Sequence, residues 1–178
     1  LAMKAHVVVV APATANTLAK LALGLADDPL GATVLATHSP LIVCPAMDAH
    51  MYDSAATQSN LEVLRKRGAH VVEPGEGRLA SGLAGRGRME EPARIVEHVR
   101  WVLGRDGDYA GRRVVVSAGG TQEPLDPVRH IANRSSGKMG YAVAAAARDR
   151  GADVTLISGP SALPEPAGVR FVKVGTAL

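Results

Sequence analysis

The sequence predicts an α/β protein whose parallel sheets carry helices on both faces, a three-layer arrangement. Short apolar runs alternate along the chain with helix-like patterns, which is the order of strands and helices in such folds. The runs are continuous, as in strands buried on both faces, and Val7–Ala11, Leu41–Cys44 and Val114–Val116 are the clearest. A loop of small or polar residues follows each of them, where α/β proteins gather their ligands.

These elements form two groups, separated by the charged linker 105–111. In the first group, strands are expected at residues 7–11, 41–44 and 69–72, and helices from Thr14 to about Asp27–Pro29, over 57–67, and from Pro92 onward. In the second group, strands are expected at residues 113–116, 153–157 and 169–174, with a helix over 136–150. We therefore expect two partial domains, residues 1–106 and 107–178.

The composition narrows the class of ligand and the compartment. Of the 178 residues, 47% are apolar, enough for a core, but 3% are aromatic, which leaves little for stacking on nucleic-acid bases. The net charge of +3 comes from short basic clusters, which suit anionic small molecules better than nucleic acid. One cysteine, Cys44, suits the reducing cytoplasm. Val7–Ala11 is too short to span a membrane, and we expect no membrane partner.

The loops after the first two strands carry polar side chains. Ala11–Thr17 either only caps the next helix or holds a planar heterocycle through its backbone and Asn16, and the sequence leaves both open. Asp48 follows the second strand, at the end where chemistry gathers. Met47 and Met51, four residues apart, are expected as core filler.

The Gly-rich segment Gly75–Gly87 begins like a dinucleotide fingerprint, but more loop follows where a helix must begin, so we reject that interpretation. We expect a mobile flap that orders over a ligand, with a plain surface loop as the alternative.

The longest loop, residues 117–140, combines two features of an anion site. Arg129 can fork onto a carboxylate or phosphate, and Asn133 both donates and accepts hydrogen bonds. Ser135–Lys138 open a helix, whose first N–H groups favour an anion. Because the loop and the helix start coincide, we expect a binding site here rather than an ordinary cap.

Together these motifs resemble the bifunctional phosphopantothenoylcysteine decarboxylase/phosphopantothenate–cysteine ligase family of bacterial coenzyme A biosynthesis. The first half is similar to the flavin-containing cysteine decarboxylases, with an APATANT-like loop at 11–17, a PxMNxxMW-like signature at 45–52 and a LACGxxGxGRM-like flap at 79–89. The second half resembles the start of the ligase, with an AGGTxEPxDPVRxIxNxSSGKMG run at 118–140. The resemblance implies flavodoxin-like and Rossmann-like sheets.

The resemblance also implies roles in the decarboxylase half. Thr14, Ala15 and Asn16 would contact flavin mononucleotide (FMN), which oxidises the cysteine moiety of 4'-phosphopantothenoylcysteine and so eases loss of carbon dioxide. Asp48 stands where the family has an asparagine that engages the substrate carboxylate. Ser81 stands where the family has a cysteine that protonates the enethiolate, giving 4'-phosphopantetheine.

For the ligase half, the resemblance ties Arg129 and Asn133 to an acyl-cytidylate formed from 4'-phosphopantothenate and CTP with Mg²⁺, from which the amine of cysteine displaces CMP. It implies a homo-oligomer. It also implies a central fragment, with a phosphate loop and a catalytic histidine before Leu1 and ligase lysines after Leu178, which we expect to be inactive alone.

Asp48 and Ser81 depart from the family pattern. An ionised Asp48 would repel the substrate carboxylate, so we expect desolvation to keep it protonated. A hydroxyl is a poorer acid than a thiol, so Ser81 would relay or position a proton, with a neutral Asp48 taking over part of the cysteine's role. Two alternatives remain: a related flavoprotein acting on another cysteine-like substrate, and a flavin-binding regulatory protein whose decarboxylase activity has lapsed.

Overall fold

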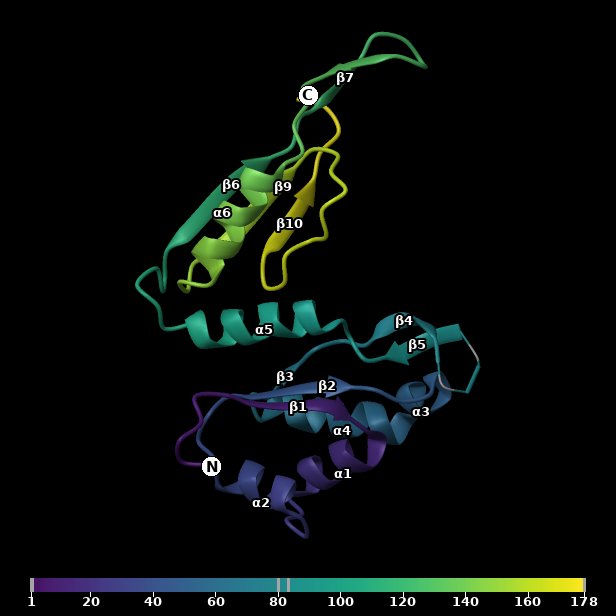
Figure 1. Ribbon diagram of the computed structural model, residues 1–178, viewed down its shortest axis with the longest axis vertical. Helices are drawn as coiled ribbons and strands as arrows, with labels where there is room; N and C mark the ends of the chain where they lie inside the picture. Colours follow the sequence, from purple (N-terminus) through teal and green to yellow (C-terminus); the bar gives the residue numbers. More distant parts are fainter. Residues whose placement is uncertain (1, 80, 83, 178) are drawn as a thin grey trace. The chain divides into compact units, whose positions relative to one another are not determined.

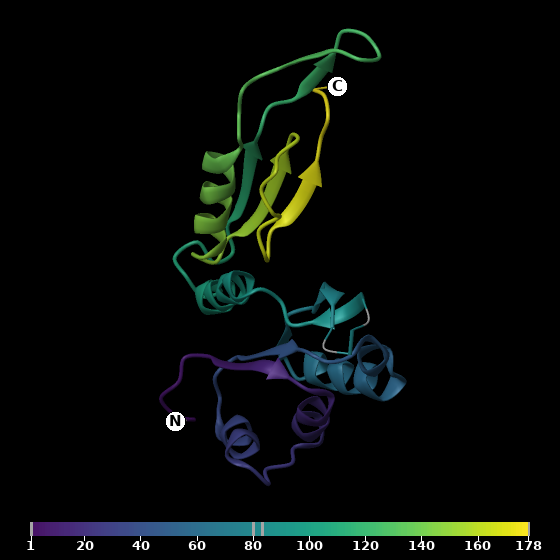
Figure 2. The same cartoon turned by 45° about the vertical axis from the view of Figure 1, so that its right-hand side comes forward.

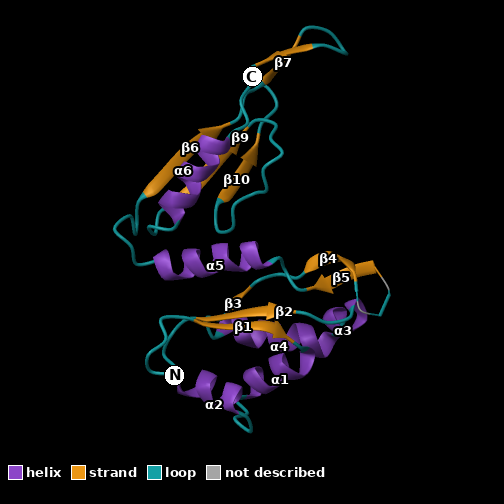
Figure 3. Ribbon diagram, viewed as in Figure 1, coloured by secondary structure: helices purple, strands orange, loops and turns teal. Residues whose placement is uncertain are grey.

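A computed structural model of the chain describes residues 2–79, 81–82 and 84–177. The chain divides into two compact units, Leu1–Val99 and Arg100–Leu178, and the division falls inside helix α5 (Pro92–Gly104). Each unit is built around a parallel sheet, shown with its helices in Figures 1 and 3. The predicted parallel-sheet α/β class is confirmed.

The sheet of the first unit has the strand order β1-β2-β3. Its strands are β1 (Val8–Ala13), β2 (Leu41–Pro45) and β3 (His70–Val71), all parallel. Its helices are α1 (Ala15–Leu23), α2 (Pro29–Ala36), α3 (Ala49–Asp53) and α4 (Ala55–Lys66). The core between sheet and helices includes Val10, Leu18, Val43, Leu61 and Leu64.

The first helix is shorter than the sequence suggested. Gly24 adopts the left-handed conformation (φ 71°) and ends α1, so Leu25 lies outside the helix and is exposed. The Asp28 side chain accepts a hydrogen bond of 2.7 Å from the Gly31 amide and caps α2. The motif expected to end one helix therefore begins another, because an aspartate before a proline is also a helix start.

The Gly-rich segment is an antiparallel hairpin rather than a loop. Strand β4 (Gly75–Arg78) pairs with β5 (Ala84–Arg88), as Figure 3 shows. This hairpin is not predicted from the sequence, because its two strands lack the alternation of apolar residues that marks a strand. Of the LACGxxGxGRM-like flap, residues 80 and 83 lie outside the described part of the chain.

The second unit has a parallel sheet of order β10-β9-β6 with one helix packed on it. Its strands are β6 (Arg113–Ala118), β9 (Asp153–Ser158) and β10 (Arg170–Lys173), and the helix is α6 (Lys138–Arg148). A second hairpin, β7 (Gln122–Pro124) with β8 (His130–Ala132), lies within the long loop and extends beyond the carboxyl end of β6, as Figure 2 shows. No helix in the described part of the chain is long and apolar enough to cross a membrane.

Candidate functional site

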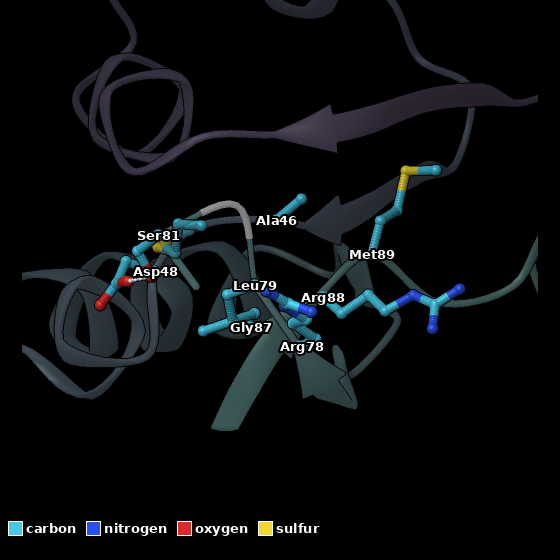
Figure 4. A pocket seen from close by; sticks show the side chains of 9 residues that line it. Ala46, Asp48, Arg78, Leu79, Ser81, Gly87, Arg88 and Met89 are labelled. Carbon is cyan, nitrogen blue, oxygen red and sulfur yellow. Dashed lines mark hydrogen bonds between the residues drawn. The ribbon is translucent and has the colours of Figure 1, made fainter. Parts of the chain in front are cut away.

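A pocket of about 330 Å³ lies between the loop after β2 and the β4–β5 hairpin (Figure 4). Its lining comprises Ala46, Met47, Asp48, Arg78, Leu79, Ser81, Gly87, Arg88 and Met89. The pocket therefore brings together two sequence motifs that lie some thirty residues apart, at the carboxyl end of a parallel strand. This is where the alternation of strands and helices predicts a ligand site.

Asp48 and Ser81 form a direct hydrogen bond in this pocket. Ser81 Oγ donates to Asp48 Oδ2 over 2.5 Å, drawn as a dashed line in Figure 4. The other oxygen of Asp48 accepts from the His50 amide at 3.1 Å and so caps α3. These two donors, Ser81 first, hold the pKa of Asp48 below its ordinary value. The expectation of a protonated Asp48 is therefore wrong, because hydrogen bonds to the carboxylate outweigh its desolvation.

The hairpin is fixed to the loop after β2 by its backbone. The Met47 amide donates to the Gly87 carbonyl at 2.9 Å. Gly87 has φ 152°, and a Cβ there would lie 2.2 Å from the Met47 carbonyl oxygen. Only glycine fits this close approach, which explains why a glycine stands here in β5.

A second contact between the hairpin and the body of the unit lies outside the pocket. The Glu73 carboxylate accepts hydrogen bonds from the Tyr52 hydroxyl (2.6 Å), Arg65 (2.5 Å) and Arg86 (2.7 Å). Burial acts to raise the pKa of Glu73, but the Tyr52 hydrogen bond and the two arginines together hold it below its ordinary value. Burial, and then the bond to Glu73, raise the pKa of Tyr52.

The loop expected to hold a flavin lies next to this pocket. Ala13, the last residue of β1, is in register with Pro45 of β2, and the Ala46 amide donates to the Ala13 carbonyl at 3.0 Å. Thr14 caps α1 by accepting from the Thr17 amide at 3.2 Å, as predicted, and the side chain of Asn16 is exposed.

These residues fit a flavin. Ala11 and Ala15, which are not buried, have side chains small enough to let a flat ring approach the backbone, and Asn16 offers an exposed amide that both donates and accepts hydrogen bonds. Asn16 and Thr14 do not line the 330 Å³ pocket. The strand register nevertheless places their loop beside Ala46, which is a lining residue.

Several pocket residues were not predicted individually. Arg78 and Arg88 bring two positive charges to the lining, and Arg88 also forms an ion pair with Glu91 at 2.7 Å. Met47 packs against the core of the first unit, as its spacing suggested, and also lines the pocket, whereas Met51 is half exposed and is not core filler.

In the second unit, a hollow of about 470 Å³ lies at the start of α6. It is lined by residues 117–119 at the end of β6 and by residues 134–140. Gly137, with φ 75°, precedes the helix, and Ser135 Oγ accepts from its amide at 3.3 Å. Ser136 Oγ accepts from the Lys138 amide at 3.5 Å, so the two serines occupy the amides of Gly137 and Lys138, although no side chain caps the helix itself.

The structure does not bring Arg129 and Asn133 together. They flank the three-residue strand β8, about 13 Å apart along an extended chain. Arg129 is exposed and bonds Asp126 at 2.6 Å, whereas Asn133 lies against Gly120, next to the hollow. Neither side chain lines the hollow.

Comparison with known proteins identifies the class of protein. Residues 1–104 match the sequence model of the family described as Flavoprotein, and the chain belongs to that family. Residues 109–178 match the model described as the DNA/pantothenate metabolism flavoprotein C-terminal domain.

The more particular resemblance, to the bifunctional proteins of coenzyme A biosynthesis, is also confirmed. Coenzyme A biosynthesis bifunctional protein CoaBC of Mycobacterium tuberculosis is 51% identical over 99% of this chain, which spans 44% of the length of that relative. A cysteine/cysteine sulfinic acid decarboxylase from an unknown prokaryote is 47% identical over 94% of this chain and 48% of its own length. A PPC decarboxylase mutant complexed with pantothenoylaminoethenethiol is 42% identical, with a TM-score of 0.53 over 54% of each chain.

Proposed function

We propose that this chain is part of a bifunctional protein of coenzyme A biosynthesis. Its first unit would decarboxylate 4'-phosphopantothenoylcysteine to 4'-phosphopantetheine with FMN. The observation that carries the proposal is the Ser81–Asp48 hydrogen bond inside a pocket at the carboxyl end of β2. The family membership and the ligand of the related PPC decarboxylase structure support the choice of cofactor and substrate.

Thr14, Ala15 and Asn16 would hold FMN, with the backbone of the small-residue loop against the ring. FMN supplies, when bound, the oxidation of the substrate's cysteine moiety that eases loss of carbon dioxide, and the matching reduction. The remaining chemistry is that of the pocket residues.

The pocket residues would bind the substrate carboxylate and deliver a proton. The guanidinium of Arg78 would attract the substrate carboxylate and so offset the repulsion between that carboxylate and the negative charge of Asp48. Once carbon dioxide has left, Ser81 Oγ gives its hydrogen to the substrate and regains one from Asp48, which takes it up from solvent. Since Asp48 is ionised at neutral pH, this relay begins only when the carboxylate picks up a proton.

The second unit would contribute to ligation of 4'-phosphopantothenate with cysteine, using CTP with Mg²⁺. We place the cytidylate-linked intermediate near the hollow at the start of α6, next to Asn133. Arg129, on the β7–β8 hairpin, would reach it only by leaving Asp126. We also propose a cytoplasmic homo-oligomer. The exposed apolar side chains of Leu125, Val128 and Ile131 on and beside that hairpin support self-association.

The test uses the full-length protein loaded with FMN. Incubation with 4'-phosphopantothenoylcysteine should release carbon dioxide and form 4'-phosphopantetheine, and incubation with 4'-phosphopantothenate, cysteine, CTP and Mg²⁺ should form CMP. A protein that binds FMN but releases no carbon dioxide from that substrate contradicts the decarboxylase proposal.

A second candidate is an FMN-dependent decarboxylase acting on a different cysteine-like substrate. The 47% identity to a cysteine/cysteine sulfinic acid decarboxylase favours it, as does Asp48 in place of the expected asparagine. Carbon dioxide release from free or peptide-bound cysteine, but not from 4'-phosphopantothenoylcysteine, would distinguish this candidate. Release from neither substrate by a protein that binds FMN would favour the lapsed, regulatory form.

A further inference from the structure

The Ser81–Asp48 bond joins two parts of the chain whose relative position must be fixed by other contacts. Asp48 lies on the body of the first unit, whereas Ser81 lies in the turn of the β4–β5 hairpin. A two-stranded hairpin has little stability of its own in water. Whether Ser81 reaches Asp48 therefore depends on what holds the hairpin down.

Few side chains of the hairpin can hold it. Three of the five residues of β5 are glycine or alanine, and its backbone is tied to the body by the Met47–Gly87 hydrogen bond. Of the two arginines of β5, Arg88 pairs with Glu91, three residues along the chain, whereas Arg86 reaches residues 52 and 73 in the body of the unit. It donates to Glu73 Oε2 at 2.7 Å, and its guanidinium carbon lies 5.2 Å from the centre of the Tyr52 ring.

Glu73 is itself held by two elements of the body. The Tyr52 hydroxyl, from α3, donates to it at 2.6 Å, and Arg65, from α4, donates at 2.5 Å. The carboxylate is thus oriented from two sides before it meets Arg86. Such a network of charges fixes geometry better than an isolated surface ion pair, which contributes little.

None of Tyr52, Arg65, Glu73 and Arg86 lines the pocket. Any effect of Glu73 on the chemistry must therefore pass through the elements that it joins, which are the hairpin through Arg86 and the body through Tyr52 and Arg65. We infer that Glu73 is a positioning residue that fastens the hairpin through Arg86 and so sets Ser81 against Asp48. This inference rests on the proposed decarboxylase function.

The test compares two arginines that share this carboxylate. Arg86→Gln removes the bond that crosses to the hairpin, whereas Arg65→Gln, the matched control, removes a bond of similar length and exposure within the body. In the full-length FMN-loaded protein, Arg86→Gln should lower kcat for 4'-phosphopantetheine formation about three- to tenfold, and Arg65→Gln less than twofold. Arg86→Lys, which keeps a cation, should recover part of the loss.

Two further measurements separate positioning from a general loss of stability. In the Ser81→Ala background, Arg86→Gln should cause no further loss, because the residue being positioned is gone. Amide hydrogen exchange at Met47 and residues 84–88 should speed up in Arg86→Gln but not in Arg65→Gln, independently of activity.

Equal effects of the two variants, or an Arg86→Gln effect undiminished in Ser81→Ala, would overturn the inference. Both results leave the proposed function standing if the wild-type protein releases carbon dioxide and Ser81→Ala slows product formation. If the wild-type protein releases none, the proposed function fails, and the exchange measurement still decides whether Glu73 fastens the hairpin.

Discussion

At the scale of single residues, the site depends on the charge state of Asp48. Two hydrogen-bond donors stabilise its carboxylate, and the Ser81 hydroxyl is one of them. Asp48 is therefore an ionised carboxylate that accepts a hydrogen bond from the Ser81 hydroxyl, whereas the family pattern has an asparagine and a cysteine at these two positions. Two predictions follow from this difference in acidity.

The first prediction concerns pH. Because the pKa of Asp48 lies below its ordinary value, only a small fraction of the carboxyl carries a proton at neutral pH, and this fraction rises as pH falls. If proton delivery limits turnover, kcat for decarboxylation should rise by up to about tenfold per pH unit between neutral pH and about pH 5. Asp48→Asn should flatten this profile and lower KM about tenfold, since the repulsion of the substrate carboxylate is gone.

Steady-state carbon dioxide release at several pH values measures both effects. An Asp48→Asn protein with the wild-type profile and KM would show that the carboxylate plays no part in proton delivery.

The second prediction concerns the hydroxyl of Ser81. Ser81→Cys introduces a thiol, which is the better acid, with an ordinary pKa of about 8.5. It should raise kcat on the order of tenfold and add a loss of activity above that pKa, where the thiol is ionised. Ser81→Ala is the control, and a Cys variant no faster than the Ala variant would count against a proton-donating role at this position.

At the scale of elements, the β4–β5 hairpin forms one wall of the pocket, and Gly87 sets its distance from the loop after β2. Gly87→Ala places a methyl group 2.2 Å from the Met47 carbonyl oxygen in a backbone conformation that alanine avoids. We expect a loss of about 1–3 kcal/mol in the free energy of unfolding of the first unit, together with most of the activity.

Chemical denaturation of the full-length protein measures this loss. Gly82→Ala is a useful control, because Gly82 also has positive φ but its Cβ would meet nothing within 4 Å. Similar losses for both variants would mean that backbone strain, not the contact with Met47, is responsible.

Glu73 gives the hairpin a pH dependence of its own. Its pKa in the folded protein is depressed, so its contribution to docking is complete above its ordinary value of 4.5 and is lost as pH falls through the lower folded value. Amide exchange of residues 84–88, measured relative to the unfolded chain at the same pH, should therefore accelerate below about pH 4.5, and Glu73→Gln should remove that dependence. Acceleration of the same size in Glu73→Gln would assign it to another carboxyl.

At the scale of the whole molecule, the sequence predicts the sheets well and the hairpins poorly. Continuous apolar runs located β1, β2 and β6 to within two residues, because a buried parallel strand leaves a strong hydrophobic signal. The hairpins β4–β5 and β7–β8 consist largely of glycine and of polar and charged residues, and nothing in their composition marks a strand.

The same contrast holds for the site. Asp48, Thr14 and Asn16 were predictable because they follow strands, and Ser81 because of the flap motif. The contact of Ser81 with Asp48, the place of Arg78 and the role of Glu73 depend on how the hairpin folds back. Periodicity along the chain carries no information about such a long-range contact.

Self-association is also a prediction at this scale. Val128 is 89% exposed at the end of the β7–β8 hairpin, an unusual place for a large apolar side chain. If the hairpin joins subunits, Val128→Asp should shift the full-length protein to a smaller species in analytical ultracentrifugation, since it would bury an unpaired charge in the interface. An unchanged sedimentation coefficient would place the interface elsewhere.

The most direct test of the whole account is a single turnover of the full-length, FMN-loaded protein with 4'-phosphopantothenoylcysteine, following carbon dioxide and 4'-phosphopantetheine separately. Wild-type protein should form both together. In Ser81→Ala, carbon dioxide should still be released while 4'-phosphopantetheine forms at least tenfold more slowly, as expected for loss of a proton donor that acts after decarboxylation. Equal rates of product formation in the two proteins, or no carbon dioxide from the wild type, would contradict it.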